Sequence, residues 1–177
     1  MQSLNSNYFQ LFNLPESCVL DQDKLSEAYR VQQQEIHPDR FANAPEPEKL
    51  RAIQLSSYLN EAYETLKSPL RRAAYLLSLR EIDVENVDQN DLGMELLLEQ
   101  IQLREQLDEL PMDDSALDEL DRLRMEVRVK LDSRQAKFAE HFEQEQFADA
   151  KKIYHELQFL YKLLAEIDAG EETRLGY

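Results

Sequence analysis

Three consecutive residues near the start of the chain, His37, Pro38 and Asp39, bring together side chains that can do chemistry. A histidine beside a carboxylate can act as a general base or help to hold a metal ion. Proline cannot donate a backbone hydrogen bond and disfavours a helical conformation in the residue before it. A helix that reaches His37 should therefore end there and release the two polar side chains into a loop.

The other two histidines also lie near carboxylates, so a carboxylate and histidine metal enzyme is one interpretation of the chain. His141 lies among three glutamates, and His155 precedes Glu156. Against this interpretation, the two histidines fall on different predicted helices and have no companion at the spacing of metal ligands. A phosphate-binding glycine loop and a nucleophile elbow are also absent from the sequence. We therefore predict no catalytic residue, no metal site and no cofactor.

The segments on both sides of the tripeptide have the spacing of helices. Apolar and long side chains recur three and four residues apart over residues 23–36, and Asp21 or Asp23 can cap that helix. Pro45, Pro47 and Glu48 are typical of a second helix start. The second stripe consists of Ala52, Leu55, Leu59, Ala62, Tyr63 and Leu66. The pattern predicts two antiparallel helices with the His-Pro-Asp loop at their tip.

Composition favours an all-α protein. With 3 glycines and 6 prolines in 177 residues, strands and tight hairpins have few turn residues to use. Cys18 is the one cysteine, which excludes an internal disulfide and fits a reducing compartment. No uninterrupted apolar stretch approaches the length of a membrane span. We expect a cytoplasmic protein.

Charge divides the chain into two parts. Residues 1–80 hold nine Lys and Arg against ten Asp and Glu, whereas residues 81–177 hold eleven against twenty-six. This asymmetry predicts two domains, at 1–80 and 91–177, joined by a connector at 81–90. The acidic second domain is a poor match for nucleic acid or an anionic membrane, so neither is expected as a partner.

The second domain is predicted to be an antiparallel three-helix bundle, with helices over residues 91–110, 115–142 and 147–167. The first helix has a seam of Leu96, Gln100, Leu103, Leu107 and Leu110. At about 100° per residue, a second set of side chains falls on the side away from this seam. That set consists of Leu97, Leu98, Ile101, Gln102, Glu105 and Glu109. Phe159 and Leu163 are expected to lie off the main stripe of the third helix, which would extend the same surface.

An apolar surface bordered by carboxylates is typical of a partner-binding site. The alternative is that another part of the chain covers this face.

Several segments resemble a J domain, the module that activates the ATPase of DnaK-type chaperones. They are Tyr8-Phe-Gln-Leu-Phe-Asn-Leu-Pro15, the loop from His37 to Phe41, and Leu59-Asn-Glu-Ala-Tyr-Glu-Thr-Leu66. Residues 68–77 and 97–105 resemble the HscB family of bacterial iron-sulfur cluster assembly in particular. The resemblance spans nearly the whole chain.

The resemblance implies an adaptor with two binding surfaces. The second helix and the His37-Pro38-Asp39 loop would dock on an HscA-type chaperone, with Lys24, Arg30 and Arg40 as a positive edge. By position, Leu97, Leu98, Ile101, Gln102, Glu105, Glu109 and Phe159 match the surface that binds the IscU-type scaffold. Gln102 stands where the family pattern has a carboxylate. No zinc-binding cysteine pairs are present, so no zinc site is expected.

A third interpretation is an acidic helical adaptor that joins two proteins and regulates neither. An exposed His-Pro-Asp sequence at a helix end has no role in such an adaptor. Measurement of chaperone ATPase activity would therefore distinguish the two adaptor hypotheses.

Overall fold

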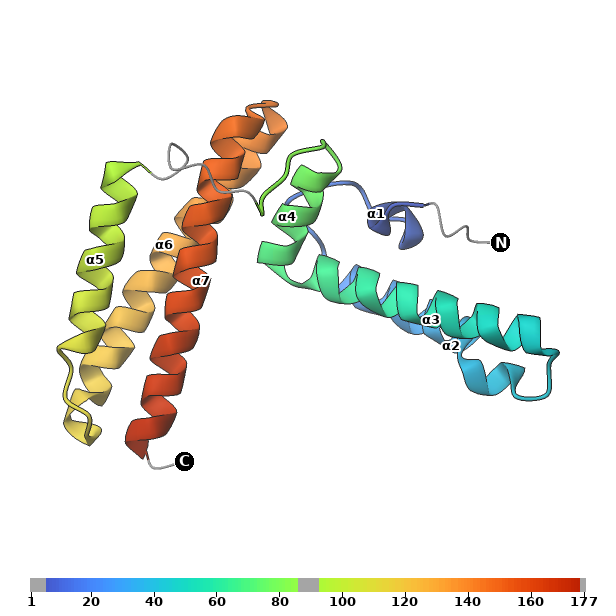
Figure 1. Ribbon diagram of the computed structural model, residues 1–177, viewed down its shortest axis with the longest axis horizontal. Helices are drawn as coiled ribbons and strands as arrows, with labels where there is room; N and C mark the ends of the chain where they lie inside the picture. The colour runs from blue at the N-terminus through green and yellow to red at the C-terminus, as the bar shows by residue number, and fades with distance from the viewer. Residues whose placement is uncertain (1–5, 86–92, 176–177) are drawn as a thin grey trace. The chain divides into compact units, whose positions relative to one another are not determined.

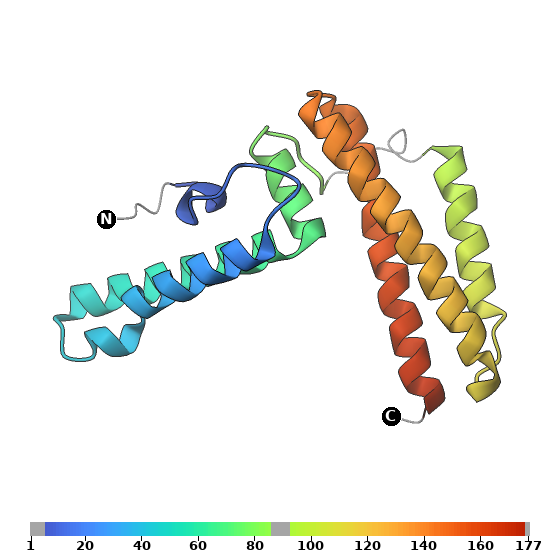
Figure 2. The same cartoon turned by 180° about the vertical axis from the view of Figure 1, so that it is seen from behind.

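The computed structural model describes residues 6–85 and 93–175, and the regular structure in these ranges is helical. This confirms the all-α prediction. The chain divides into two compact units, residues 1–79 and 80–177. Residues 86–92 lie outside the described ranges, so most of the expected connector at 81–90 stays a prediction. Figures 1 and 2 show the helices from opposite sides.

Two long helices form the body of the first unit, α2 (Gln22–Ile36) and α3 (Glu46–Lys67). They run side by side in both views, as an antiparallel hairpin (Figures 1 and 2). The Asp21 side chain caps α2 by accepting hydrogen bonds from two backbone N–H groups, each at 3.1 Å. Pro47 lies in the first turn of α3, where the missing N–H of proline has no helical partner to lose. The predicted hairpin is confirmed.

Two shorter helices complete the first unit, α1 (Tyr8–Leu11) and α4 (Pro69–Ser78), and neither was predicted. α1 is too short for a helical period to repeat in its sequence. α4 continues the helical pattern of α3 after a break at Ser68, whose side chain caps the new helix. These helices close the core over the hairpin. Its buried apolar residues are Phe9, Leu11, Phe12, Leu25, Ala52, Leu59, Ala62, Leu66, Ala73, Leu76 and Leu77.

Gln32 is a buried polar residue of this core, and its position explains why a glutamine occurs on the inner face of α2. Its side-chain amide donates a hydrogen bond to the backbone carbonyl of Leu11 at 2.6 Å. The bond joins α2 to the end of α1.

The second unit is a bundle of α5 (Met94–Asp108), α6 (Leu117–Glu143) and α7 (Phe147–Leu175), with the short 3-10 helix η3 (Asp114–Ala116) before α6. α6 and α7 join through a tight turn in which Glu145 has a positive φ of 58°. The Gln146 N–H donates to the carbonyl of His141 at 2.8 Å and closes the end of α6. The predicted three-helix bundle is confirmed, although α7 extends to Leu175 instead of ending at Ile167.

The three helices contribute different numbers of buried residues to the bundle core. Six residues of α6 are buried, and so are seven of α7, whereas among the residues described in α5 only Leu96 and Leu103 are buried. The prediction that Leu163 lies off the main stripe of its helix is wrong, because Leu163 is 0% exposed. α7 packs against both α5 and α6, so its buried face is wider than one stripe.

Within the described residues no helix is both long and apolar enough to cross a membrane.

Candidate functional site

The His-Pro-Asp tripeptide lies where α2 ends and a short 3-10 helix begins. His37 is the C-terminal cap of α2, with φ of −57° and ψ of 128°, values that leave the helical region as expected before a proline. Residues Pro38–Phe41 then form a single 3-10 turn, η1. The Arg40 N–H donates to the His37 carbonyl at 3.0 Å and closes this turn. The tripeptide is therefore a defined turn, where the sequence predicted a loop.

The two polar side chains of the tripeptide are presented to solvent. The Asp39 side chain is 90% exposed and the His37 side chain is 49% exposed. His37 Nδ1 accepts a hydrogen bond from the Asp39 backbone N–H at 3.3 Å and lies 3.6 Å from Asp39 Oδ2. When Nδ1 accepts, the proton of the neutral ring is on Nε2. The turn thus offers an N–H donor and a carboxylate acceptor side by side.

The three cations predicted to contact the chaperone are exposed, and each already has an intramolecular partner. Lys24 pairs with Asp21 at 3.3 Å, and Arg30 pairs with Glu27 at 2.9 Å. Arg40 Nη1 donates to the backbone carbonyl of Gln34 at 3.0 Å, in the last turn of α2. Arg40 therefore has a structural role that the sequence did not predict, since it satisfies a helix-end carbonyl.

A groove of about 670 Å³ lies in the first unit beside the tripeptide turn, and sequence reasoning missed it. Ile36 and Phe41, which flank the tripeptide, line it together with Leu55 and Tyr58 of α3. Leu50 and Ile53 of α3 are also apolar and exposed, at 57% and 53%. The polar turn therefore has an apolar neighbourhood. The stripe on α3 did contain Leu55, but spacing alone cannot show that a residue borders a groove.

The second candidate site is the outer face of α5. Leu97, Leu98 and Ile101 are 38%, 54% and 53% exposed, although each is a large apolar residue. Gln102, Glu105 and Glu109 are exposed as well. All six residues predicted on this face are thus accessible, and the three apolar residues are bordered by carboxylates.

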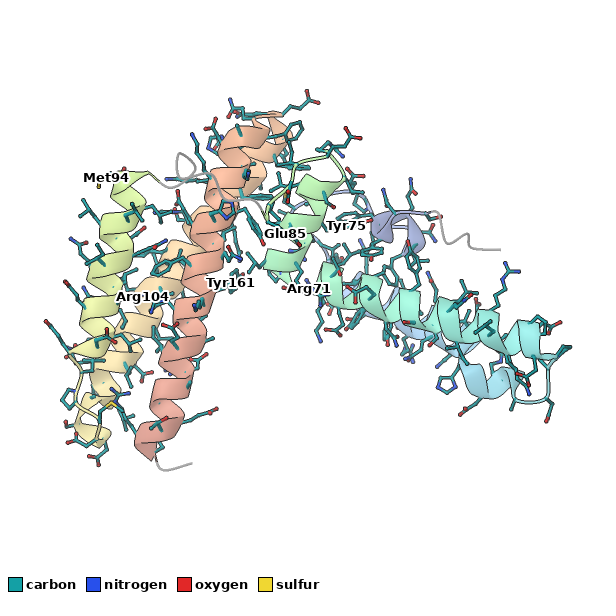
Figure 3. All side chains as sticks on the ribbon, viewed as in Figure 1. Arg71, Tyr75, Glu85, Met94, Arg104 and Tyr161 are labelled. Carbon is teal, nitrogen blue, oxygen red and sulfur yellow. The ribbon has the colours of Figure 1, made fainter. Side chains whose placement is uncertain are left out.

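Phe159 on α7 is partly exposed. Its ring contacts Arg104 of α5, a residue that the sequence analysis did not predict in this site. The guanidinium carbon of Arg104 lies 5.7 Å from the centre of the Phe159 ring, a cation–π contact. Arg104 also forms two hydrogen bonds with Glu166 of α7, at 3.1 and 3.3 Å. It is labelled in Figure 3, on α5. Leu163 is buried and is therefore not part of the exposed face that was predicted, whereas Phe159 is partly exposed.

The two other histidines lie in different surroundings. His141 Nδ1 lies 2.6 Å from the side-chain oxygen of Gln146. His155 is 4% exposed, within the core of the bundle. Among residues 6–85 and 93–175, no group of three or more His, Cys, Asp and Glu side chains is arranged to hold a metal ion.

Two family models match the chain, one on each compact unit. The DnaJ domain matches residues 7–75, and the HSCB C-terminal oligomerisation domain matches residues 92–168.

Curated relatives match over nearly the full length. A protein named co-chaperone protein HscB homolog, from Paraburkholderia phymatum, is 39% identical over 167 residues, which cover 94% of this chain and 95% of the relative. A protein of the same name from Burkholderia thailandensis is 37% identical over 172 residues, covering 97% and 98%.

Solved structures agree with these matches. The chaperone HscB from Vibrio cholerae has a TM-score of 0.85 at 35% identity, covering 94% of this chain and 98% of that one. The human co-chaperone protein HscB has a TM-score of 0.88 at 26% identity, covering 96% and 84%.

Proposed function

The chain belongs to the HscB family of J-domain co-chaperones, and from this we propose that it stimulates the ATPase of an HscA-type 70-kDa chaperone and delivers an IscU-type iron-sulfur scaffold protein to it. The observation that carries the proposal is the pairing, in one chain, of an exposed His-Pro-Asp turn with an exposed apolar face on α5. The reactions of cluster assembly would then occur on the partners, in the cytoplasm.

The chaperone end of the proposal depends on His37 and Asp39. The Asp39 carboxylate, which is 90% exposed, can form a charge-assisted, bidentate contact with an arginine of the chaperone. His37 can offer Nε2–H beside it, at the hinge between chaperone domains. Lys24 and Arg30 provide positive charge along α2, and Arg40 provides it at the turn; these charges would steer and orient an acidic surface. Because all three are exposed and internally paired, their individual contributions to affinity should be small.

The scaffold end of the proposal depends on α5. Leu97, Leu98 and Ile101 would supply the apolar centre of the interface, and Phe159 would extend it from α7. Gln102, Glu105 and Glu109 would form the polar border. An apolar centre with a charged border is the usual anatomy of a protein interface.

The test is a chaperone ATPase assay with this chain, with the scaffold, and with both together. The wild-type chain should raise the turnover of ATP, and the scaffold should raise it further, because the two binding events on the chaperone are coupled. His37→Gln should abolish the stimulation while helicity and scaffold binding stay at wild-type values. Glu64→Gln alters an exposed side chain of α3 and is the matched control.

Equal stimulation by wild type and His37→Gln would refute the proposal. A chain that binds both partners without changing ATP turnover would instead be the non-regulatory adaptor.

A further inference from the structure

α5 carries large apolar residues on two faces, one at the seam and one on the outer side. Leu96 and Leu103 face the core, whereas Leu97, Leu98 and Ile101 are exposed. At about 100° per residue, a rotation of α5 by roughly one residue position would exchange Leu96 for Leu97 at the seam. The same rotation would bring Arg104 to the position of Leu103, so burial of apolar surface favours the observed face. Interactions at the flanks of the seam add to this preference.

Ion pairs lie on both sides of the seam and oppose rotation of α5. Glu99 lies on one flank and forms hydrogen bonds with two cations of α6, Lys130 Nζ at 2.8 Å and Arg134 Nη2 at 3.1 Å. Arg104 lies on the other flank and pairs with Glu166 of α7. Rotation of α5 in either direction would separate at least one of these pairs.

The pair at Glu99 is partly shielded from water, which strengthens it relative to an ordinary surface pair. The side chains of Glu99, Lys130 and Arg134 are 18%, 28% and 20% exposed. The cluster continues to Glu156 of α7, which pairs with Arg134, and to Glu126, 3.6 Å from Lys130. Removing one charged side chain of this cluster leaves the opposite charges incompletely paired in a site that water reaches only in part.

We infer that Glu99 is a positioning residue for the scaffold-binding face: its carboxylate, held by Lys130 and Arg134, fixes the rotation of α5 that keeps Leu97, Leu98 and Ile101 exposed. This inference rests on the proposed function. Both Glu99 oxygens are already bonded within the bundle, Oε1 to Lys130 and Oε2 to Arg134, so Glu99 acts on the scaffold through α5 and not by contact.

The experiment compares Glu99→Gln, Lys130→Gln and the double variant, all in the full-length chain. Each single change should weaken binding of purified IscU-type scaffold by about three- to tenfold. Amide hydrogen exchange in α5 should accelerate by a similar factor, since the helix is less firmly held. Stimulation of the chaperone in the absence of scaffold should not change. Glu172→Gln removes the same charge from an exposed site on α7, and it should leave both affinity and exchange unchanged.

The double variant separates positioning from direct contact. If Glu99 acts through its pair with Lys130, the double variant should lose less than the sum of the two single losses. Additive losses, or a Lys130→Gln chain with wild-type affinity, would overturn the inference, as would α5 exchange that is the same in Glu99→Gln and wild type. A wild-type chain that did not bind scaffold would refute the proposed function, and exchange in α5 would then decide by itself whether Glu99 holds the helix.

Discussion

At the scale of single residues, the chemistry of the tripeptide depends on features that are local in sequence. His37 ends α2 because Pro38 follows it, and Asp39 is exposed because the 3-10 turn that begins at Pro38 projects it. For this reason the position of these residues at the end of a helix could be predicted from the sequence. The role of Arg40 could not be predicted, because its bond to the Gln34 carbonyl depends on how the turn folds back on α2.

Arg40 gives a prediction at this scale. Arg40→Ala should destabilise the end of α2 by about 0.5–1 kcal/mol, because a carbonyl of the last turn loses its donor and the helix end loses a nearby positive charge. Hydrogen exchange of the amides in the last turn of α2 would measure the change. Arg40→Lys keeps the charge and should retain part of the stability. Equal exchange rates in Arg40→Ala and wild type would show that the guanidinium does not hold the helix end.

At the scale of elements, long helices were predictable and short ones were not. α3, α6 and α7 span enough turns for their stripes to repeat several times, so their existence followed from spacing. α1 has four residues and presents no repeat. The interhelical pairs of Glu99 and Arg104 were also beyond sequence reasoning, because they depend on the rotation and axial offset of neighbouring helices.

Leu163 shows the limit of a single-stripe analysis for a helix with two neighbours. The sequence placed it on a partner-binding surface, whereas the structure buries it completely between α7 and the other helices. Phe159, from the same predicted surface, remains partly exposed. The predicted exposure is therefore observed for the α5 residues and for Phe159, but not for Leu163.

This difference gives the prediction at the scale of elements. Leu163→Ala should lower the free energy of unfolding of the bundle by about 2–5 kcal/mol, the usual cost of such a cavity in a packed core. Leu98→Ala removes the same atoms from an exposed site and should change stability by less than about 0.5 kcal/mol. Urea denaturation followed by circular dichroism would measure both. A Leu163→Ala chain as stable as Leu98→Ala would contradict the burial of Leu163.

At the scale of the whole molecule, the charge and the two candidate surfaces divide in the same way. The first 80 residues are nearly neutral and contain the tripeptide, whereas the remainder holds the large excess of acidic residues and the apolar face of α5. Acidic residues scattered over a bundle keep it soluble and reject other polyanions. Under the proposed function, recognition of the scaffold would then depend on the exposed apolar residues of α5.

The last prediction tests this division by combining one change in each unit. Asp39→Asn should abolish chaperone stimulation and leave scaffold affinity unchanged, because Asp39 is solvent-exposed in the first unit. Leu98→Glu should weaken scaffold binding by at least about tenfold, since it places a charge in an apolar interface, and should leave basal stimulation unchanged. Without the chaperone, the double variant should bind scaffold as Leu98→Glu does, because changes that share no partner contribute independently to free energy. Titration calorimetry and the ATPase assay measure the two activities separately. Loss of scaffold binding in Asp39→Asn, or loss of basal stimulation in Leu98→Glu, would show that the two surfaces do not work independently.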